Sequence, residues 1–307
     1  GGFMKVSTSI VKLAAAFSVA ILSSLAHADL KVFATVPEWG ALAETLGRDK
    51  VKVFTATTGL QDPHRIQARP SLIAKARTAN LVIATGGGLE DGWLPVVQRE
   101  ANNAEIMPNR PGYLVATQYV RMLDVPAVVD RTMGDVHAGG NPHIQTDPRN
   151  LLPIAKAISA RMQQLDPENA AYYQTQLNQF DQGWQANLQR WQKQAAPLRG
   201  VKVWYQHDGY PYMNAWLGLN QVGVLEPRPG VEPSSRQLAD ILQRQQAVQA
   251  RMVIASAYLN DAPAKWLAEK ANIPVVVLPF TVGGHEQVKN LTALYDDTLQ
   301  RLVSALK

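Results

Sequence analysis

Three short apolar runs decide the first half of the fold: Leu30-Lys-Val-Phe-Ala-Thr-Val36, Val51-Lys-Val-Phe54 and Asn80-Leu-Val-Ile-Ala84. Their length and β-branched content predict strands. Helical stretches separate them, one beginning at Gly40 and one covering residues 71–78. Strands that alternate with helices predict parallel βαβ units, so this half of the chain predicts an α/β lobe.

The same alternation returns after Gly200, with strands predicted at Val201–Tyr205, Met252–Ala255 and Val275–Leu278. Residues 151–196 differ, because they are rich in Gln, Ala, Leu and Arg and predict a long helix from about Pro167 to Gln194. We therefore predict an α/β fold of two lobes, each a parallel sheet flanked by helices, joined by a single long helix. The predicted boundaries are 29–150 for the first lobe, 151–197 for the linking helices and 198–307 for the second lobe.

The first 28 residues predict a cleaved signal peptide. A basic stretch begins at Met4, residues 10–25 are mostly apolar, and Ala26-His27-Ala28 has the small-x-small form of a signal-peptidase site. The apolar stretch is short for a membrane span and polar residues interrupt it. Residues 1–3 precede Met4 and are interpreted as an extended start or a cloning scar. The protein is thus expected in the periplasm, with a mature chain that begins near Asp29.

Composition limits both the partners and the chemistry. The chain has no cysteine, so a bound metal must be held by nitrogen and oxygen. The leader holds Lys5 and Lys12 and no acid, so the net charge falls from +5 to +3 in the mature chain. That charge is small for the length and forms no Lys/Arg block, so a nucleic-acid partner is not expected.

Three of the five histidines outside the leader stand in comparable loop settings. They are His64 in Asp-Pro-His, His143 in Asn-Pro-His and His207 in Gln-His-Asp. His207 comes two residues after a predicted strand, and ligands of open parallel sheets bind beyond the carboxyl ends of strands. Neutral imidazole is an ordinary zinc ligand. The alternative is three unrelated surface or hydrogen-bonded histidines, so the residues alone leave a shared metal site in the cleft between the lobes as one of two interpretations.

Several segments, in order along the chain, carry a resemblance to a known family. The segments are Asp62-Pro63-His64, Ala79–Val82, Gly134–His137, Gly140–His143 with Asp147–Asn150, His207-Asp208 with Trp216–Leu219, and Glu226–Ser234. With them the chain resembles the zinc- and manganese-binding solute receptors of ABC importers, the cluster A-I or cluster 9 family. The resemblance covers nearly the whole mature chain and implies two lobes joined by a rigid long helix. It also implies that His64, His143 and His207 are the metal-binding histidines.

The fourth ligand is where the chain departs from that family, whose members often carry an Asp or Glu after a late strand of the second lobe. The corresponding segment, residues 278–284, has no carboxylate. Water could complete a tetrahedron, His285 or Glu286 could reach back, or Glu38 could point into the cleft after the first strand. The alternative role for Glu38 is an ordinary first-turn carboxylate favoured by the helix dipole.

Two further residues are assigned accessory roles. Asp208 is expected to orient the imidazole of His207 or to cap a helix, because second-shell carboxylates commonly hold metal-binding histidines. His137 lies in a glycine-rich segment and is interpreted as part of a flexible surface loop. The alternative is a mobile ligand that collects metal for the cleft.

The resemblance and the three imidazoles together predict a receptor that captures zinc and delivers it to an ABC permease at the inner membrane. Manganese is the alternative cargo, less favoured because it prefers oxygen ligands. A three-histidine zinc hydrolase is the enzymatic rival, but the chain has no His-Glu-x-x-His helix and no Gly-x-Ser-x-Gly. A receptor for an organic solute is supported only by aromatic residues around Trp204. We expect a non-enzymatic monomer, with a periplasmic metallochaperone as an additional candidate partner.

Overall fold

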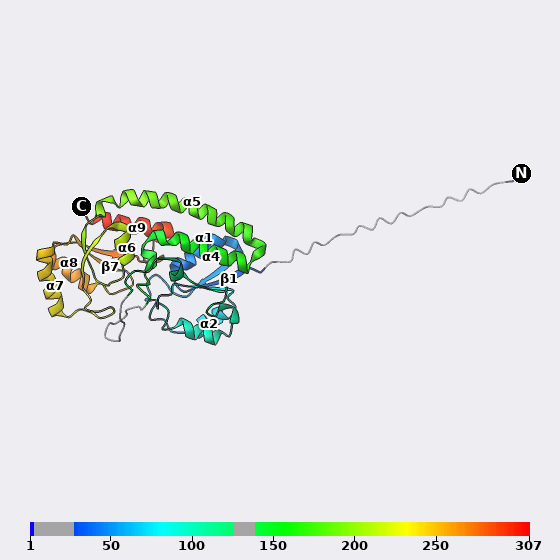
Figure 1. The fold of residues 1–307 in the computed structure, drawn as a ribbon, viewed down its shortest axis with the longest axis horizontal. Helices are drawn as coiled ribbons and strands as arrows, with labels where there is room; N and C mark the ends of the chain where they lie inside the picture. The colour runs from blue at the N-terminus through cyan, green and yellow to red at the C-terminus, as the bar shows by residue number, and fades with distance from the viewer. Residues whose placement is uncertain (3–27, 126–138) are drawn as a thin grey trace.

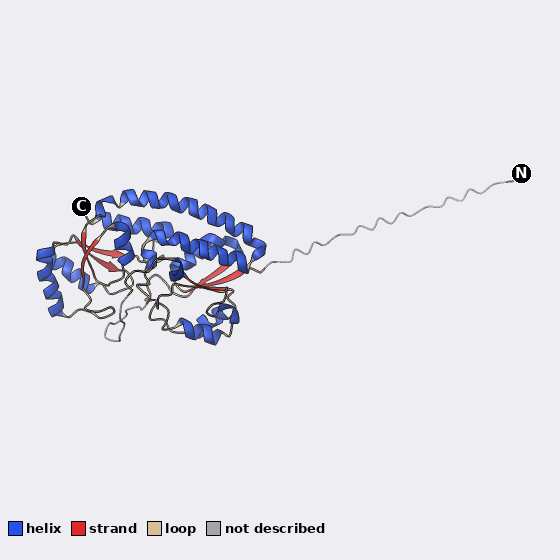
Figure 2. Cartoon of the chain, in the orientation of Figure 1, coloured by secondary structure: helices blue, strands red, loops and turns tan. Residues whose placement is uncertain are grey.

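The computed structural model describes residues 1–2, 28–125 and 139–307. Its two sheets each hold four parallel strands, in the orders β2-β1-β3-β4 and β6-β5-β7-β8. Both sheets therefore have the same topology, in which the second strand of the lobe is an edge strand that pairs with the first. Figure 2 shows the sheets as two separate groups of strands with helices around them.

The first lobe is built on short strands, of which β1 and β3 are mainly buried. Each of its three helices has a proline at its first or second position, where the missing N–H costs no hydrogen bond. Strand β1 is central, paired with β2 on one side and β3 on the other. The elements are β1 (Leu30–Ala34), α1 (Pro37–Gly47), β2 (Val51–Thr55), α2 (Pro70–Arg77), β3 (Leu81–Ala84), α3 (Leu94–Ala101) and β4 (Tyr113–Val115).

The second lobe repeats this plan around strand β5. Helix α7 begins with a capping box, in which the side chains of Ser234 and Gln237 exchange hydrogen bonds with each other's backbone N–H. The elements are β5 (Lys202–Tyr205), α6 (Pro211–Leu217), β6 (Asn220–Val224), α7 (Ser235–Val248), β7 (Met252–Ser256), α8 (Ala262–Ala271), β8 (Val275–Leu278) and α9 (Leu291–Ser304).

Helices α4 (Leu151–Leu165) and α5 (Ala170–Gln194) connect the lobes. Helix α5 runs along the whole upper edge of the molecule in Figure 1, over α4, over α1 of the first lobe and over α9 of the second. Its inward face carries a helical stripe of apolar residues that includes three large, buried rings. The three rings belong to Tyr173, Trp184 and Trp191.

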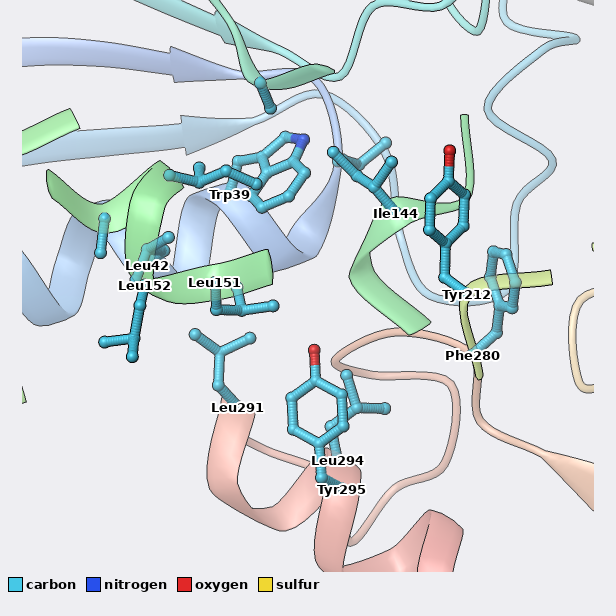
Figure 3. Close-up of a cluster of buried hydrophobic side chains, with 14 of the residues drawn as sticks. Trp39, Leu42, Ile144, Leu151, Leu152, Tyr212, Phe280, Leu291, Leu294 and Tyr295 are labelled. Carbon is cyan, nitrogen blue, oxygen red and sulfur yellow. The ribbon is translucent and has the colours of Figure 1, made fainter. Parts of the chain in front are cut away.

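One hydrophobic cluster continues from the first lobe into the second. Figure 3 shows part of it, where Trp39 of α1 and Leu151 of α4 share the cluster with Leu291 and Tyr295 of α9. The indole N–H of Trp184 donates to the carbonyl oxygen of Pro148 at 2.8 Å, which fixes α5 above the start of α4. Because the lobes share buried surface, they are held together beyond their covalent connection.

The predicted fold class is confirmed, including the parallel sheets and the long connecting helix. The sequence analysis missed β4 and β6. Both are edge strands: β4 has three residues, and β6 is half-exposed, with a polar start and Gly223 within it. The predicted signal peptide, apart from residues 1–2 and 28, and His137 lie outside the described residues. Within the described ranges, no helix is both long enough and apolar enough to cross a membrane.

Candidate metal centre

The three predicted histidines are brought together where the two lobes meet. His64 lies on the loop between β2 and α2, His143 lies just before the short helical turn at Ile144–Thr146, and His207 follows β5. The ring centroids of His64 and His143 are 6.0 Å apart, and those of His143 and His207 are 6.1 Å apart. Loops far apart in the sequence therefore place His143 near each of the other two imidazoles.

The rings are near one another but wider apart than ligands of a single metal ion. Across residues 28–125 and 139–307, no three His, Asp or Glu side chains are grouped closely enough to hold a metal as they stand. With Zn–N bonds of about 2.0–2.1 Å, two imidazoles on one tetrahedral zinc have centroids about 5 Å apart. Each pair of rings would have to approach by about 1 Å. Gly209 leaves space for this approach, since a Cβ there would lie 3.3 Å from His207 and 3.6 Å from His143.

His64 and His143 are oriented by the same local motif. The Oδ1 atom of Asp62 accepts hydrogen bonds from the backbone N–H of His64 at 3.0 Å and from its Nδ1 at 2.8 Å. Asn141 Oδ1 does the same for His143, at 3.0 and 2.8 Å. A proton on Nδ1 leaves the Nε2 lone pair to a metal, so each Asx-Pro-His segment selects the ligating nitrogen by itself.

His207 is oriented by a distant residue. Its Nδ1 lies 2.9 Å from Oε2 and 3.1 Å from Oε1 of Glu226, which follows β6. Burial alone would lower the pKa of His207, but the hydrogen bond and charge of Glu226 raise it above the ordinary value. Glu226, which was not among the predicted site residues, makes the hydrogen bond to His207, while the Asp208 carboxylate accepts one from Gln221. The accessory role of Asp208 stays a prediction.

The role of Glu226 was not predicted from the sequence, because strand β6 was not predicted. Glu226 comes two residues after the end of β6, and β6 pairs directly with β5, the strand that precedes His207. The carboxyl ends of neighbouring parallel strands meet at one edge of the sheet. An acidic residue just past an unrecognised edge strand was the available signal.

Glu38, the candidate fourth ligand, is buried at the start of α1. Its Oε2 accepts a hydrogen bond of 2.6 Å from the hydroxyl of Thr281 in the opposite lobe. Desolvation raises the pKa of Glu38 to about 7, against the effect of that hydrogen bond. His285 and Glu286, the other candidates, are not among the residues that line the hollows around the histidines.

Two hollows meet at the histidines. The inner one is lined by Glu38 and His143 together with apolar and neutral polar residues. The outer one, of about 850 Å³, is lined by His64 and His207. Tyr258 borders both hollows. Three carboxylates and one guanidinium line the outer hollow, an arrangement that favours a cation over an anion. These charged residues are Asp62, Glu226, Glu232 and Arg65.

A tight turn after β8 forms one wall of the inner hollow. Phe280 has a φ of +69°, and the N–H of Thr281 donates to the carbonyl oxygen of Pro279 at 2.8 Å. These features match a classic γ-turn, which is rare and strained for a bulky residue. The turn brings the Phe280 ring to 5.2 Å from that of His143 and directs Thr281 to Glu38. It supplies an aromatic wall but no carboxylate.

A two-lobed α/β protein with three imidazoles gathered from both lobes, beside an acidic hollow, has the fold and site of a metal-binding solute receptor. The family described as zinc-uptake complex component A, periplasmic (ZnuA), matches residues 32–305. The chain belongs to this family. It is therefore a substrate-binding component of a metal ABC transporter, in a family of receptors and not of enzymes, and its partner is the importer's membrane complex.

Two relatives support the family, and one of them names manganese as its metal. The chain is 23% identical over 259 residues to the manganese ABC transporter substrate-binding lipoprotein PsaA of Streptococcus pneumoniae, covering 82% of this chain and 80% of that protein. It is 22% identical to the metal ABC transporter substrate-binding lipoprotein FimA of Streptococcus parasanguinis, with coverage of 84% and 82%.

Solved structures share the fold. A crystal structure of ZnuA superposes with a TM-score of 0.75 at 20% identity, covering 91% of this chain and 100% of that one. FpvC from Pseudomonas aeruginosa, solved in complex with Mn²⁺, gives a TM-score of 0.73 at 20% identity, with coverage of 91% and 99%. At this identity the likeness concerns the fold alone.

Proposed function

We propose that this protein captures zinc in the periplasm and delivers it to the permease of an ABC importer. The proposed ligands are the Nε2 atoms of His64, His143 and His207. The observation that carries the proposal is that the Nδ1 atom of every one of these imidazoles lies against a side-chain oxygen. Three imidazoles oriented in this way form a nitrogen-rich site, which suits zinc better than manganese.

We propose Glu38 as the fourth ligand, with water as the alternative. Glu38 lines the same hollow as His143 and is buried, so a charge on it would be poorly solvated without a cation nearby. Replacing Glu38 with Gln separates the two arrangements. A zinc affinity that falls about tenfold or more supports the carboxylate ligand, whereas an unchanged affinity supports water.

Manganese is the second candidate cargo, favoured by the manganese receptor PsaA among the relatives and by the carboxylates near the site. Calorimetric titration of the metal-stripped mature protein with zinc, with manganese as competitor, decides between them. One-to-one zinc binding that manganese does not displace supports the proposal. Tighter binding of manganese would reassign the cargo, and no binding of either metal would contradict the site.

Single histidine variants test the ligand set. Replacing His64, His143 or His207 with Ala is expected to weaken zinc binding more than 100-fold, since loss of even an outer-shell partner costs about 10–100-fold. His285→Ala is the matched control, because its Nδ1 accepts a hydrogen bond from the N–H of Gln287 and the residue lines neither hollow. Equal affinity in all four variants would remove the site.

We also propose that residues 1–28 direct export and are cleaved after Ala28. The basic start, the apolar stretch and the small-x-small site support this assignment. N-terminal sequencing of the protein recovered from a periplasmic fraction is the test. A first residue of Asp29 supports cleavage there, and an uncleaved chain contradicts it.

A further inference from the structure

Tyr212, on helix α6 of the second lobe, makes a contact with the first lobe that the metal ligands do not explain. The residue is buried, and its hydroxyl donates to the carbonyl oxygen of Asn141 at 2.7 Å. The same hydroxyl oxygen accepts from the backbone N–H of Leu123 at 3.0 Å. Leu123 and Asn141 are themselves joined, since the N–H of Asn141 donates to the carbonyl oxygen of Leu123 at 2.8 Å. Tyr212 therefore holds two first-lobe segments together.

Both ends of this contact are close in sequence to a histidine of the site. Asn141 orients His143 through its side-chain oxygen, as described above. Tyr212 lies five residues after His207, in the first turn of the helix that follows the His207 loop. A weaker second link runs in parallel, because Asn141 Nδ2 lies 3.4 Å from the carbonyl oxygen of Asp208. The hydroxyl of Tyr212 thus connects the backbone segments on which two proposed ligands stand.

The His143 loop is also supported from the opposite side. A Cβ on Gly87, in the glycine-rich turn after β3, would lie only 3.3 Å from Pro142. Gly87 has a φ of +62°, so a side chain there would be both strained and crowded. The loop is therefore held between the Gly87 turn and Tyr212, and its position relative to His207 depends on the Tyr212 contact.

We propose that Tyr212 is a positioning residue for metal capture, because its hydroxyl fixes the gap between the His143 and His207 rings. This inference rests on the proposed function of the histidines as ligands. Metal ligands must be held closely to their bound geometry for tight binding. The centroids of the His143 and His207 rings are 6.1 Å apart, about 1 Å farther than in a tetrahedral zinc site. Additional freedom of the two loops would therefore weaken metal binding.

The hydroxyl can be removed without the ring by Tyr212→Phe. We expect zinc affinity to fall about tenfold in this variant, equivalent to about 1.4 kcal/mol. The matched control is Tyr210→Phe, because Tyr210 is equally buried and lies near the same site, but its hydroxyl bonds to Ser256 within the second lobe. This control is expected to keep its zinc affinity within about twofold.

A spectroscopic measurement separates positioning from general destabilisation. Cobalt(II) in a four-coordinate site absorbs strongly in the visible range, and additional ligands weaken those bands. We expect intense bands in the wild type and Tyr210→Phe, and weaker or shifted bands in Tyr212→Phe. If Tyr212→Phe binds zinc as tightly as Tyr210→Phe and gives the wild-type cobalt spectrum, the inference is overturned.

Amide hydrogen exchange tests the contact without any metal. The Leu123 N–H donates to Tyr212, so it should exchange faster in Tyr212→Phe and at the wild-type rate in Tyr210→Phe. An unchanged exchange rate at Leu123 would show that the Tyr212 hydroxyl does not hold this segment. A wild type that binds neither zinc nor manganese overturns the proposed function, and that result is distinct from a failure of the Leu123 measurement.

Discussion

The two sides of the candidate metal centre orient their histidines in different ways. In the first lobe, Asp62 and Asn141 each hold the imidazole two residues ahead, through the same pair of hydrogen bonds. In the second lobe, His207 depends on Glu226, which is 19 residues away on the loop after another strand. The first arrangement needs only a short segment of chain, whereas the second needs the sheet to be formed.

The two sides therefore depend on the fold to different extents. A side chain that bonds to the backbone N–H two residues later forms an Asx-turn, and the proline between them restricts the backbone further. The Asx-Pro-His histidines can therefore be oriented before the lobes meet. His207 gains its orientation when β6 pairs with β5, so its geometry follows the stability of the second lobe.

Replacing Asn141 with Ala should have the largest effect, because Asn141 takes part in both kinds of arrangement. Its Oδ1 orients His143 locally, while its Nδ2 reaches the carbonyl oxygen of Asp208 in the other lobe. We expect zinc affinity to fall about 100-fold, measured by competition titration. Asn141→Asp keeps the acceptor and loses the donor, so it should recover at least about tenfold of that loss. Equal losses in the two variants would show that local orientation contributes little.

Glu38 extends the comparison, because the hydroxyl that donates to its carboxylate belongs to Thr281 of the opposite lobe. The pKa of Glu38 in the folded protein is about 7, above the ordinary value of 4.5. Between these two pH values the carboxyl group is ionised in the unfolded chain and still protonated in the folded one. The free energy of unfolding therefore falls as the pH rises through this range. Metal-stripped Glu38→Gln removes this cost. Its free energy of unfolding, relative to wild type, should rise by about 2 kcal/mol between pH 5 and pH 8.

Asp62 supplies the contrasting control for that experiment. Burial alone would raise the pKa of Asp62, but hydrogen bonds from His64 lower it to about 2. The Asp62 carboxylate is therefore ionised in both the folded and the unfolded chain at pH 5 and at pH 8. The ionisation of the Asp62 carboxylate itself should therefore contribute no change in the relative stability of Asp62→Asn across this range. A Glu38→Gln difference that is also independent of pH would mean that Glu38 is not desolvated as the structure shows.

The same distinction explains what could be predicted from the sequence. The parallel sheets followed from apolar runs, and the Asx-Pro-His segments could be recognised in the sequence because their contacts are local. Glu226 could not be assigned, since its role depends on β6, an edge strand without a continuous apolar run. The γ-turn at Phe280 could not be predicted either. A positive φ is expected at glycine and not at phenylalanine, and Phe280 is held in this conformation by contacts from the other lobe.

Glu226→Gln tests the distant arrangement with a smaller change. Gln retains an oxygen for the Nδ1–H of His207 but loses the charge, so zinc affinity should fall about tenfold. Glu232→Gln is the control, since Glu232 lines the same hollow but is exposed and has no hydrogen bond to His207 in the part of the chain that the structure describes. Equal losses in both variants would indicate a general effect of negative charge in the outer hollow instead of orientation of His207.

Asp62→Asn should have the smallest effect on zinc binding. Position 141 already carries Asn in the same motif, with the same distances of 3.0 and 2.8 Å to its histidine, so an amide oxygen is sufficient for the local turn. We expect an affinity within about threefold of wild type, and about a tenfold loss for Asp62→Ala, which removes the acceptor. A loss in Asp62→Asn as large as that in Glu226→Gln would contradict the comparison, because it would show that His64 also needs a charged partner.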